Sequence, residues 1–203
     1  MNKTSFLIAL AATAALLSAC SREAAAPAAA TPAASAAAAG QQPQGVSIET
    51  IQQETKGFTV GSTMSARTVY VFFDAQCPHC SALWYSAKPL KSQAKFVWIP
   101  VRLLNDNSES QGAAILAAKD PVAAMDDHEA SMMDKKGGIK AEGDVAAQRA
   151  QIKKNTELFT KYAFGAVPTL VSKNAQTNAV ITQEGSLATP QLAAFLGVPA
   201  PAQ

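Results

Sequence analysis

The chain has 203 residues and a formal net charge of +2, and much of its hydrophobic content is alanine near the N-terminus. This length suffices for one globular domain with short appendages. The sequence contains no long run of lysine or arginine, which argues against a protein that binds nucleic acid, and we expect no such partner.

The first segment has the features of a signal peptide. Lys3 supplies a positive charge, and residues 6–17 form an apolar stretch shorter than the roughly 20 residues that span a membrane. The stretch ends in Leu17-Ser18-Ala19-Cys20, which resembles a bacterial lipobox, although its small residues would also suit ordinary secretory cleavage. We expect residues 1–19 to be a lipoprotein signal peptide and the mature protein to be attached to a membrane surface through lipid on its cysteine.

Residues 20–44 complete the predicted appendage. After Cys20 come alanine, proline, serine and glutamine with hardly a bulky side chain. This composition cannot bury a core and predicts a flexible tether. Ser21 rather than aspartate follows the cysteine, which by the enterobacterial sorting rule favours the outer membrane. The folded domain is predicted to span residues 45–203.

The predicted domain begins with a short helix within residues 46–56. Residues 68–73 and 96–101 are apolar runs rich in β-branched and aromatic side chains, which is typical of buried strands. Between these strands a helix is expected to begin at residues 77–80 and to end near Pro89.

A helical block, a hairpin and a last helix follow. The block is predicted as three helices, with Ser108 as the N-cap of the first and Pro121 in the first turn of the second. Their expected ranges are residues 108–118, 121–133 and 145–162. Residues 169–171 and 179–182 predict the hairpin, and Thr189-Pro190 predicts an N-cap followed by proline at the first helical position. The order of elements indicates an α/β fold.

The strongest chemical signal is Cys77-Pro78-His79-Cys80, at the junction of a buried strand and a helix. At the N-cap, the Cys77 sulfur would face unpaired N–H groups of the first turn, which favour its thiolate. Pro78 suits the first helical position, and Cys80 could attack a mixed disulfide formed at Cys77. His79, as a cation, would stabilise the thiolate further; the alternative is an exposed residue without an electrostatic role.

Other uses of the motif fit less well. A bridge between Cys77 and Cys80 closes almost no loop, so it would stabilise the fold little. Haem attachment needs histidine at the position of Ser81, and a zinc site needs a second pair of ligands. We expect no metal and no cofactor, only a redox-active Cys77–Cys80 disulfide.

The predicted helix 121–133 carries four soft or borderline metal ligands: Met125, His128, Met132 and Met133. A copper-binding lipoprotein that delivers metal would use such residues together with Cys77 and Cys80, and this is the alternative function. We favour a helix with Val122, Met125 and Met132 on its core face and His128 in solvent.

Over roughly residues 57–197 the sequence resembles the periplasmic Dsb family of thiol–disulfide oxidoreductases. Three segments carry the likeness: Val71-Phe72-Phe73-Asp74, Cys77-Pro78-His79-Cys80 and Gly165-Ala166-Val167-Pro168-Thr169. The resemblance implies a thioredoxin-like fold with a helical insertion and catalysis by Cys77 and Cys80. It also implies a cis peptide between Val167 and Pro168, held near Cys77, beside backbone that pairs with an extended substrate. The sequence alone would equally suit a strand-initiating proline there.

The branch of the family, and so the direction of electron flow, stays open. The tetrapeptide and Val167 resemble the oxidase DsbA, whereas Val71 and Asp74 resemble the catalytic domain of the DsbC/DsbG branch of reductases and isomerases. Asp74 is a candidate for assisting proton transfer, or an ordinary polar strand end. The separate N-terminal dimerisation domain of DsbC and DsbG has no counterpart here, so a monomer is expected. The resemblance implies periplasmic protein thiols or disulfides and a membrane redox partner as partners.

Overall fold

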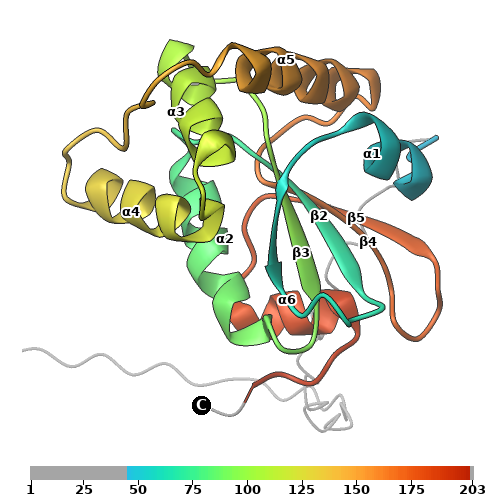
Figure 1. The fold of residues 1–203 in the computed structure, drawn as a ribbon. Coiled ribbons are helices and arrows are strands. Elements are labelled where there is room, and N and C mark those ends of the chain that lie inside the picture. Colours follow the sequence, from blue (N-terminus) through green and yellow to red (C-terminus); the bar gives the residue numbers. More distant parts are fainter. Residues whose placement is uncertain (1–44, 202–203) are drawn as a thin grey trace, which may run out of the picture. The chain divides into compact units, whose positions relative to one another are not determined.

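The computed structural model describes residues 45–201, in which a five-stranded sheet carries helices on both faces (Figure 1). The predicted signal peptide (1–19), lipidated Cys20 and tether (20–44) lie outside the described residues. The strands are β1 (Phe58–Gly61), β2 (Thr68–Phe73), β3 (Lys95–Pro100), β4 (Thr169–Lys173) and β5 (Val180–Glu184). Their order in the sheet is β1-β3-β2-β4-β5, with β2 and β3 parallel and the other pairs antiparallel.

Seven helical segments surround the sheet: α1 (Ile48–Glu54), α2 (Pro78–Ala87), the 3₁₀ turn η1 (Lys88–Leu90), α3 (Asp106–Ala117), α4 (Pro121–Met133), α5 (Ala146–Lys161) and α6 (Thr189–Leu196). Strand β2 lies at the centre of the sheet, and its side chains alternate between two cores. Val69, Val71 and Phe73 pack with α2 and α6, whereas Tyr70 and Phe72 pack with α1 and α5. Burial of both faces explains why this strand has an unbroken apolar sequence. The expected α/β architecture is confirmed, and α3, α4 and α5 form the predicted helical insertion between β3 and β4.

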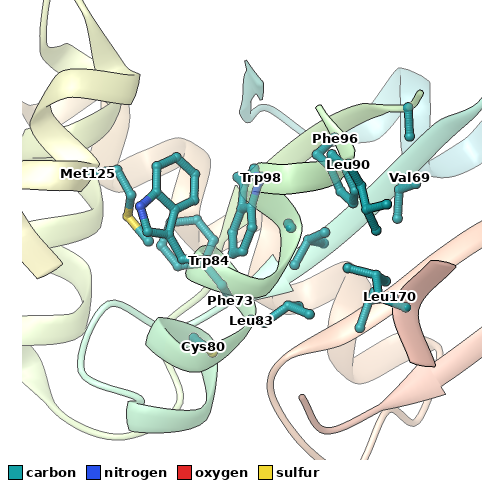
Figure 2. Packing of buried hydrophobic residues seen from close by; sticks show 14 of the residues in the cluster. Val69, Phe73, Cys80, Leu83, Trp84, Leu90, Phe96, Trp98, Met125 and Leu170 are labelled. Carbon is teal, nitrogen blue, oxygen red and sulfur yellow. The ribbon is translucent and has the colours of Figure 1, made fainter. Parts of the chain in front are cut away.

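An aromatic cluster holds α2 against the sheet (Figure 2). The ring of Trp84 on α2 lies edge-on to Trp98 on β3, with 5.0 Å between centroids, and Phe73 at the end of β2 lies 5.6 Å from Trp98. Such edge-to-face pairs add about 0.5–1.5 kcal/mol beyond the burial of their area. The cluster therefore fixes the position of the helix that begins with the cysteine motif.

Strand β1 was not predicted, because four residues at the sheet edge give too short a pattern. It runs antiparallel to β3 and contributes Phe58 to the aromatic cluster. Gly57 permits this pairing, since a Cβ at that position would lie 2.2 Å from the carbonyl oxygen of Trp98. The strand β1 is the edge strand of the sheet, next to β3.

Two predicted helix caps were displaced. The N-cap of α3 is Asn105, and Ser108 is the third helical residue, whose hydroxyl accepts a hydrogen bond from the Asn105 N–H. Thr189 is the first residue of α6 after the N-cap Ala188, and its hydroxyl donates to the Ser86 carbonyl at 2.9 Å. In both cases the side chain that was expected to cap the first turn of its helix makes a different hydrogen bond. No helix within residues 45–201 is both long and apolar enough to cross a membrane.

The prediction that His128 lies in solvent was wrong. His128 is 0% exposed, and α4 presents it to the loop that follows β2. Its Nε2 lies 2.7 Å from the carbonyl oxygen of Ala75, and its Nδ1 accepts a hydrogen bond from the N–H of Ile139 at 3.3 Å. These two partners assign a neutral ring with the proton on Nε2. Gly138 covers the ring at a distance that leaves no room for a Cβ.

His128 is therefore expected to make folding acid-sensitive. Burial lowers the pKa of His128 below its ordinary value of 6.5, although its bond to Ala75 opposes this. The unfolded chain then binds the proton first, so stability falls as the pH drops below about 6.5. His128→Asn should lower the free energy of unfolding by about 2–4 kcal/mol at pH 7.5, since two buried backbone groups lose their partner. The measurement is denaturant unfolding.

The difference between wild type and His128→Asn should shrink as the pH falls from about 7.5 to about 5.5, because only the wild type loses the contribution of a neutral His128. Replacement of the exposed Asp127 on the same helix by asparagine is the control and should leave the stability nearly unchanged. A difference between wild type and His128→Asn that stays constant over this range would contradict the buried neutral ring.

Candidate active site

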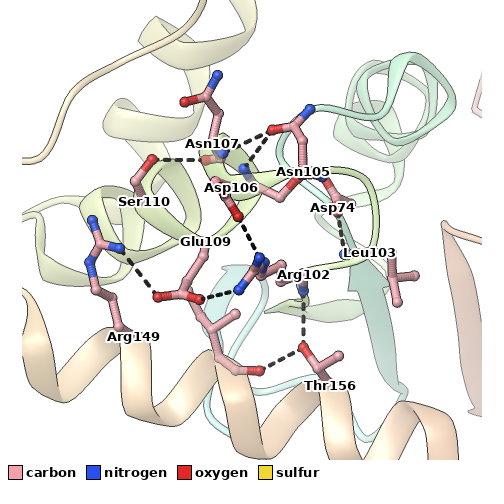
Figure 3. Close-up of polar contacts among 12 residues, drawn as sticks. Asp74, Arg102, Leu103, Asn105, Asp106, Asn107, Glu109, Ser110, Arg149 and Thr156 are labelled. Atoms are coloured by element: carbon pink, nitrogen blue, oxygen red, sulfur yellow. Dashed lines mark hydrogen bonds and ion pairs between the residues drawn. The ribbon is translucent and has the colours of Figure 1, made fainter.

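The loop between β2 and α2 is anchored by the carboxylate of Asp74, which is fully buried. One oxygen accepts the N–H of Gln76 at 2.8 Å, and the other accepts the N–H of Leu104 at 3.0 Å. The second oxygen also accepts the N–H of Leu103 at 2.8 Å (Figure 3). The Asp74 carbonyl accepts the N–H of Cys77 at 3.0 Å. Asp74 thus ties together the loops that follow β2 and β3. A part in proton transfer stays a prediction.

Cys77 is the N-cap of α2, and Pro78 is the first helical residue, as the motif indicated. Cys77 is 9% exposed and Cys80 is 0% exposed, and both are free thiols in this structure. His79 and Pro78 are exposed. Cys80 lies one helical turn after Cys77 and is fully buried. A sulfur that approaches from solvent therefore reaches Cys77 first.

The environment lowers the pKa of Cys77 from 9.0 to about 6. The largest cause is the hydrogen bond from the Cys80 thiol; burial opposes the shift, and the backbone N–H groups of Cys80 and His79 and the charge of His79 assist it. The sequence pointed to the helix N-terminus and to His79, but the largest single cause is the second thiol.

The pKa of Cys80 is shifted in the opposite direction. Burial raises it, and so do the hydrogen bond to Cys77 and the negative charge on that sulfur. At neutral pH the pair therefore holds one thiolate, on Cys77, and one thiol, on Cys80. A thiolate is the nucleophile in disulfide exchange, and a thiol that keeps its proton is protected until the exchange begins.

The loop before β4 faces the motif. The peptide bond between Val167 and Pro168 is cis, as the resemblance implied, and the Cys77 sulfur lies 3.5 Å from the Val167 carbonyl oxygen. Pro168 is buried, while Gly165 and Ala166 are exposed. The structure thus places Val167 and Pro168 beside Cys77, although they are about ninety residues apart in the chain.

A pocket of about 200 Å³ opens beside Cys77. Cys77 and Ser81 lie on one wall, and Glu129, Met132 and Met133 of α4 lie on the other. A larger hollow of about 670 Å³ lies between α3 and α5, but its lining includes neither cysteine and carries ion pairs such as Arg149 with Glu109. The smaller pocket is the one that adjoins the reactive sulfur.

The sequence did not single out Gln76, Gln111 or Glu129 as residues near the site. The Gln76 amide donates to the Gln111 side chain, which in turn donates to the Gly137 carbonyl, so this chain of bonds joins the motif loop to the loop after α4. Glu129 follows Met125 by four positions and precedes Met132 by three, so a charged residue on an apolar helical stripe was the available signal.

The structure offers no support for the copper alternative. Both ring nitrogens of His128 have backbone partners, which leaves neither free to bind a metal. Within residues 45–201 no group of three or more histidine, cysteine, aspartate or glutamate side chains is placed to hold an ion.

Two known proteins are similar to this chain in sequence. The thiol:disulfide interchange protein DsbG of Pseudomonas aeruginosa is 34% identical over 140 residues, which cover 68% of this chain and 54% of that protein. DsbG of Escherichia coli K12 is 38% identical over 65 residues, or 31% of this chain and 26% of that protein. The chain thus spans about half the length of the first relative and a quarter of the second. No family model matches it.

Two solved structures share the fold. The catalytic domain of Proteus mirabilis ScsC aligns with a TM-score of 0.56 at 15% identity, over 73% of this chain and 96% of that one. Pseudomonas aeruginosa DsbA2 aligns with a TM-score of 0.56 at 19% identity, over 68% of this chain and 91% of that one. The sequence similarity to DsbG shows that the chain belongs to the Dsb family, and the two solved structures show its thioredoxin-like fold.

Proposed function

We propose that this protein is an envelope enzyme that exchanges disulfides with periplasmic proteins through Cys77 and Cys80. The observation that carries the proposal is the geometry of the pair: Cys77 is the N-cap of α2 and lies 3.5 Å from the Val167 carbonyl oxygen, while Cys80 is fully buried behind it. The two pKa values shift in opposite directions, down to about 6 for Cys77 and upward for Cys80, as this geometry favours. A structural disulfide has no need of such a difference, whereas an exchange reaction needs one accessible thiolate and one protected thiol. The similarity to two proteins named DsbG supports the same conclusion.

In the oxidising direction, a substrate thiolate attacks the Cys77 sulfur of the Cys77–Cys80 disulfide. The bond between the two protein sulfurs breaks, a mixed disulfide forms at Cys77, and Cys80 leaves and takes up a proton. A second substrate thiolate then attacks the first substrate sulfur, and Cys77 leaves as a stable thiolate. The substrate loses two electrons and two protons in forming its disulfide. The reducing direction reverses these steps, with Cys80 resolving the mixed disulfide.

The segment before Pro168 supplies the surface for the substrate chain. The Val167 carbonyl lies 3.5 Å from the Cys77 sulfur, and Gly165 and Ala166 beside it are exposed. An extended substrate segment can pair with this backbone by strand addition, which brings its cysteine to Cys77. Recognition through backbone accepts many sequences, as an enzyme acting on many proteins requires.

The direction of exchange follows from the potential of the pair and from its redox partner. A thiolate stabilised at Cys77 favours the reduced form, which makes the disulfide oxidising, as in an oxidase. The named relatives favour a DsbG-like reductase or isomerase. An oxidase would be trapped in cells mainly as the disulfide, and a reductase or isomerase mainly as the dithiol.

The proposal includes a location. A signal peptide over residues 1–19 and lipid on Cys20 would attach the enzyme to the periplasmic side of a membrane, the outer membrane being favoured. A tether over residues 20–44 would let a monomeric domain reach its substrates and a membrane redox partner. A structurally similar protein from Salmonella is described as a periplasmic thioredoxin-like protein.

Substitution of each cysteine tests the assigned roles. Cys77→Ala should abolish exchange with a peptide disulfide, because the remaining thiol, Cys80, is fully buried and keeps its proton. Cys80→Ala should leave Cys77 able to attack but unable to resolve, so mixed disulfides with substrates should accumulate and be identified by mass spectrometry. Cys20→Ser is the control and should exchange like the wild type in solution. Full exchange by Cys77→Ala would refute the proposal.

A further inference from the structure

One carboxyl group beside the reactive sulfur has no part in the exchange described above. Glu129 on α4 is 2% exposed, although its neighbour Asp127 lies in solvent. It lines the pocket of about 200 Å³ together with Cys77 and Ser81, and Met132 and Met133 complete its wall. A carboxyl group is rarely buried this fully without a cationic partner.

None of the charged groups around Glu129 is a cation paired with its carboxyl group. Lys88 is the cation on this side, but its Nζ is paired with Asp126 at 2.5 Å and lies over the ring of Tyr85. Ser81 from α2 is hydrogen-bonded to the carboxyl group, and the other charges that act on it are those of Cys77 and Asp126. His128, the preceding residue, is neutral and bonded to Ala75.

We propose that Glu129 holds a proton for the exchange reaction, taking one up when Cys77 becomes a thiolate and releasing it when Cys77 enters a disulfide. The proposal deepens the proposed function and rests on it. Two negative charges that share a small, partly apolar pocket repel each other, so ionisation of one disfavours ionisation of the other. The pocket of about 200 Å³ that both groups line also has room for water, with Ser81 and Gln76 as polar partners.

The pKa of Glu129 is shifted in the direction that the proposal requires. Burial raises the pKa of Glu129 to about 7, and the charges of Cys77 and Asp126 add to the shift, while Ser81 and Lys88 oppose it. In the disulfide form Cys77 carries no charge, so one of the causes disappears and the pKa of Glu129 falls. Near neutral pH, Glu129 is therefore more protonated in the reduced protein than in the oxidised one.

The protons of the reaction then balance within the site. When a substrate dithiol reduces the Cys77–Cys80 bond, two electrons pass to the protein and two protons leave the substrate. Cys80 binds one proton, because its pKa is strongly raised. Glu129 binds the second in proportion to the rise of its own pKa, and the remainder goes to solvent. Reoxidation of the pair releases the proton of Cys80 and the fraction of a proton that Glu129 had taken up.

The test is the reduction potential of the Cys77/Cys80 pair, measured against glutathione between about pH 5.5 and 8.5 in three proteins. These are the wild type, Glu129→Gln, and Glu157→Gln as a control that removes an exposed carboxylate from α5. Around pH 7, reduction of the wild type should be accompanied by the uptake of more than one proton per two electrons. Reduction of Glu129→Gln should take up one proton, so its reduction potential should fall by about 30 mV per pH unit. Glu157→Gln should follow the wild type.

The curves of reduction potential against pH for the wild type and for Glu129→Gln should meet below about pH 6 and separate above pH 7. In the alkaline part, Glu129→Gln should favour the reduced form by roughly three- to tenfold in the equilibrium constant, because no carboxylate repels the Cys77 thiolate. A curve for Glu129→Gln parallel to that of the wild type would overturn the proposal. If the wild type itself failed to equilibrate with glutathione, the proposed function would fail instead.

A second measurement needs no variant at Glu129. The carboxyl carbon of Glu129 can be titrated by NMR in the wild type, once with the Cys77–Cys80 disulfide formed and once with it reduced. The pKa of Glu129 should be higher in the reduced protein. Equal values in the two states would overturn the proposal even if the exchange reaction itself proceeds.

Discussion

The difference between the two thiols depends on where α2 begins. The helix starts at the end of the central strand β2, so Cys77 takes the N-cap position at the surface while Cys80 lies one turn deeper, fully buried. The hydrogen bond between the two sulfurs then acts in opposite senses, lowering the pKa of Cys77 and raising that of Cys80. The rest of the fold holds this junction in place: Trp84 packs α2 on the sheet, and Asp74 ties its loop to the loop after β3.

The helical insertion is part of the site rather than an appendage. Two successive residues of α4 point toward the motif loop and serve different purposes there. His128 bonds to the Ala75 carbonyl and so fixes the loop, and Glu129 shares a pocket with Cys77. A helix that both positions the reactive loop and lines its pocket can influence the chemistry of the thiols without contributing a sulfur.

The sequence was sufficient to predict an element or a site residue wherever a local pattern determines the structure. The bounds of β2 and of α4 match their predicted ranges, and the cysteine motif lies where the strand-to-helix transition placed it. The four residues of β1 carried no pattern long enough to read. The burial of His128 depends on tertiary partners such as Ala75, which is 53 residues away in the chain, so no local rule could reveal it. For Glu129 the only local signal was its place on the same helical stripe as Met125 and Met132. The cis bond before Pro168 came from the family resemblance, since a proline alone does not determine it.

The central claim is that Cys77 is the thiolate and Cys80 the protected thiol. The most direct test is the pH dependence of alkylation of the reduced wild-type protein, with each cysteine resolved by mass spectrometry. Modification of Cys77 should rise with a midpoint near pH 6, in keeping with its lowered pKa, while Cys80 stays unmodified in the folded protein. A midpoint for Cys77 at its unshifted pKa of 9.0, or faster modification of Cys80, would contradict the account.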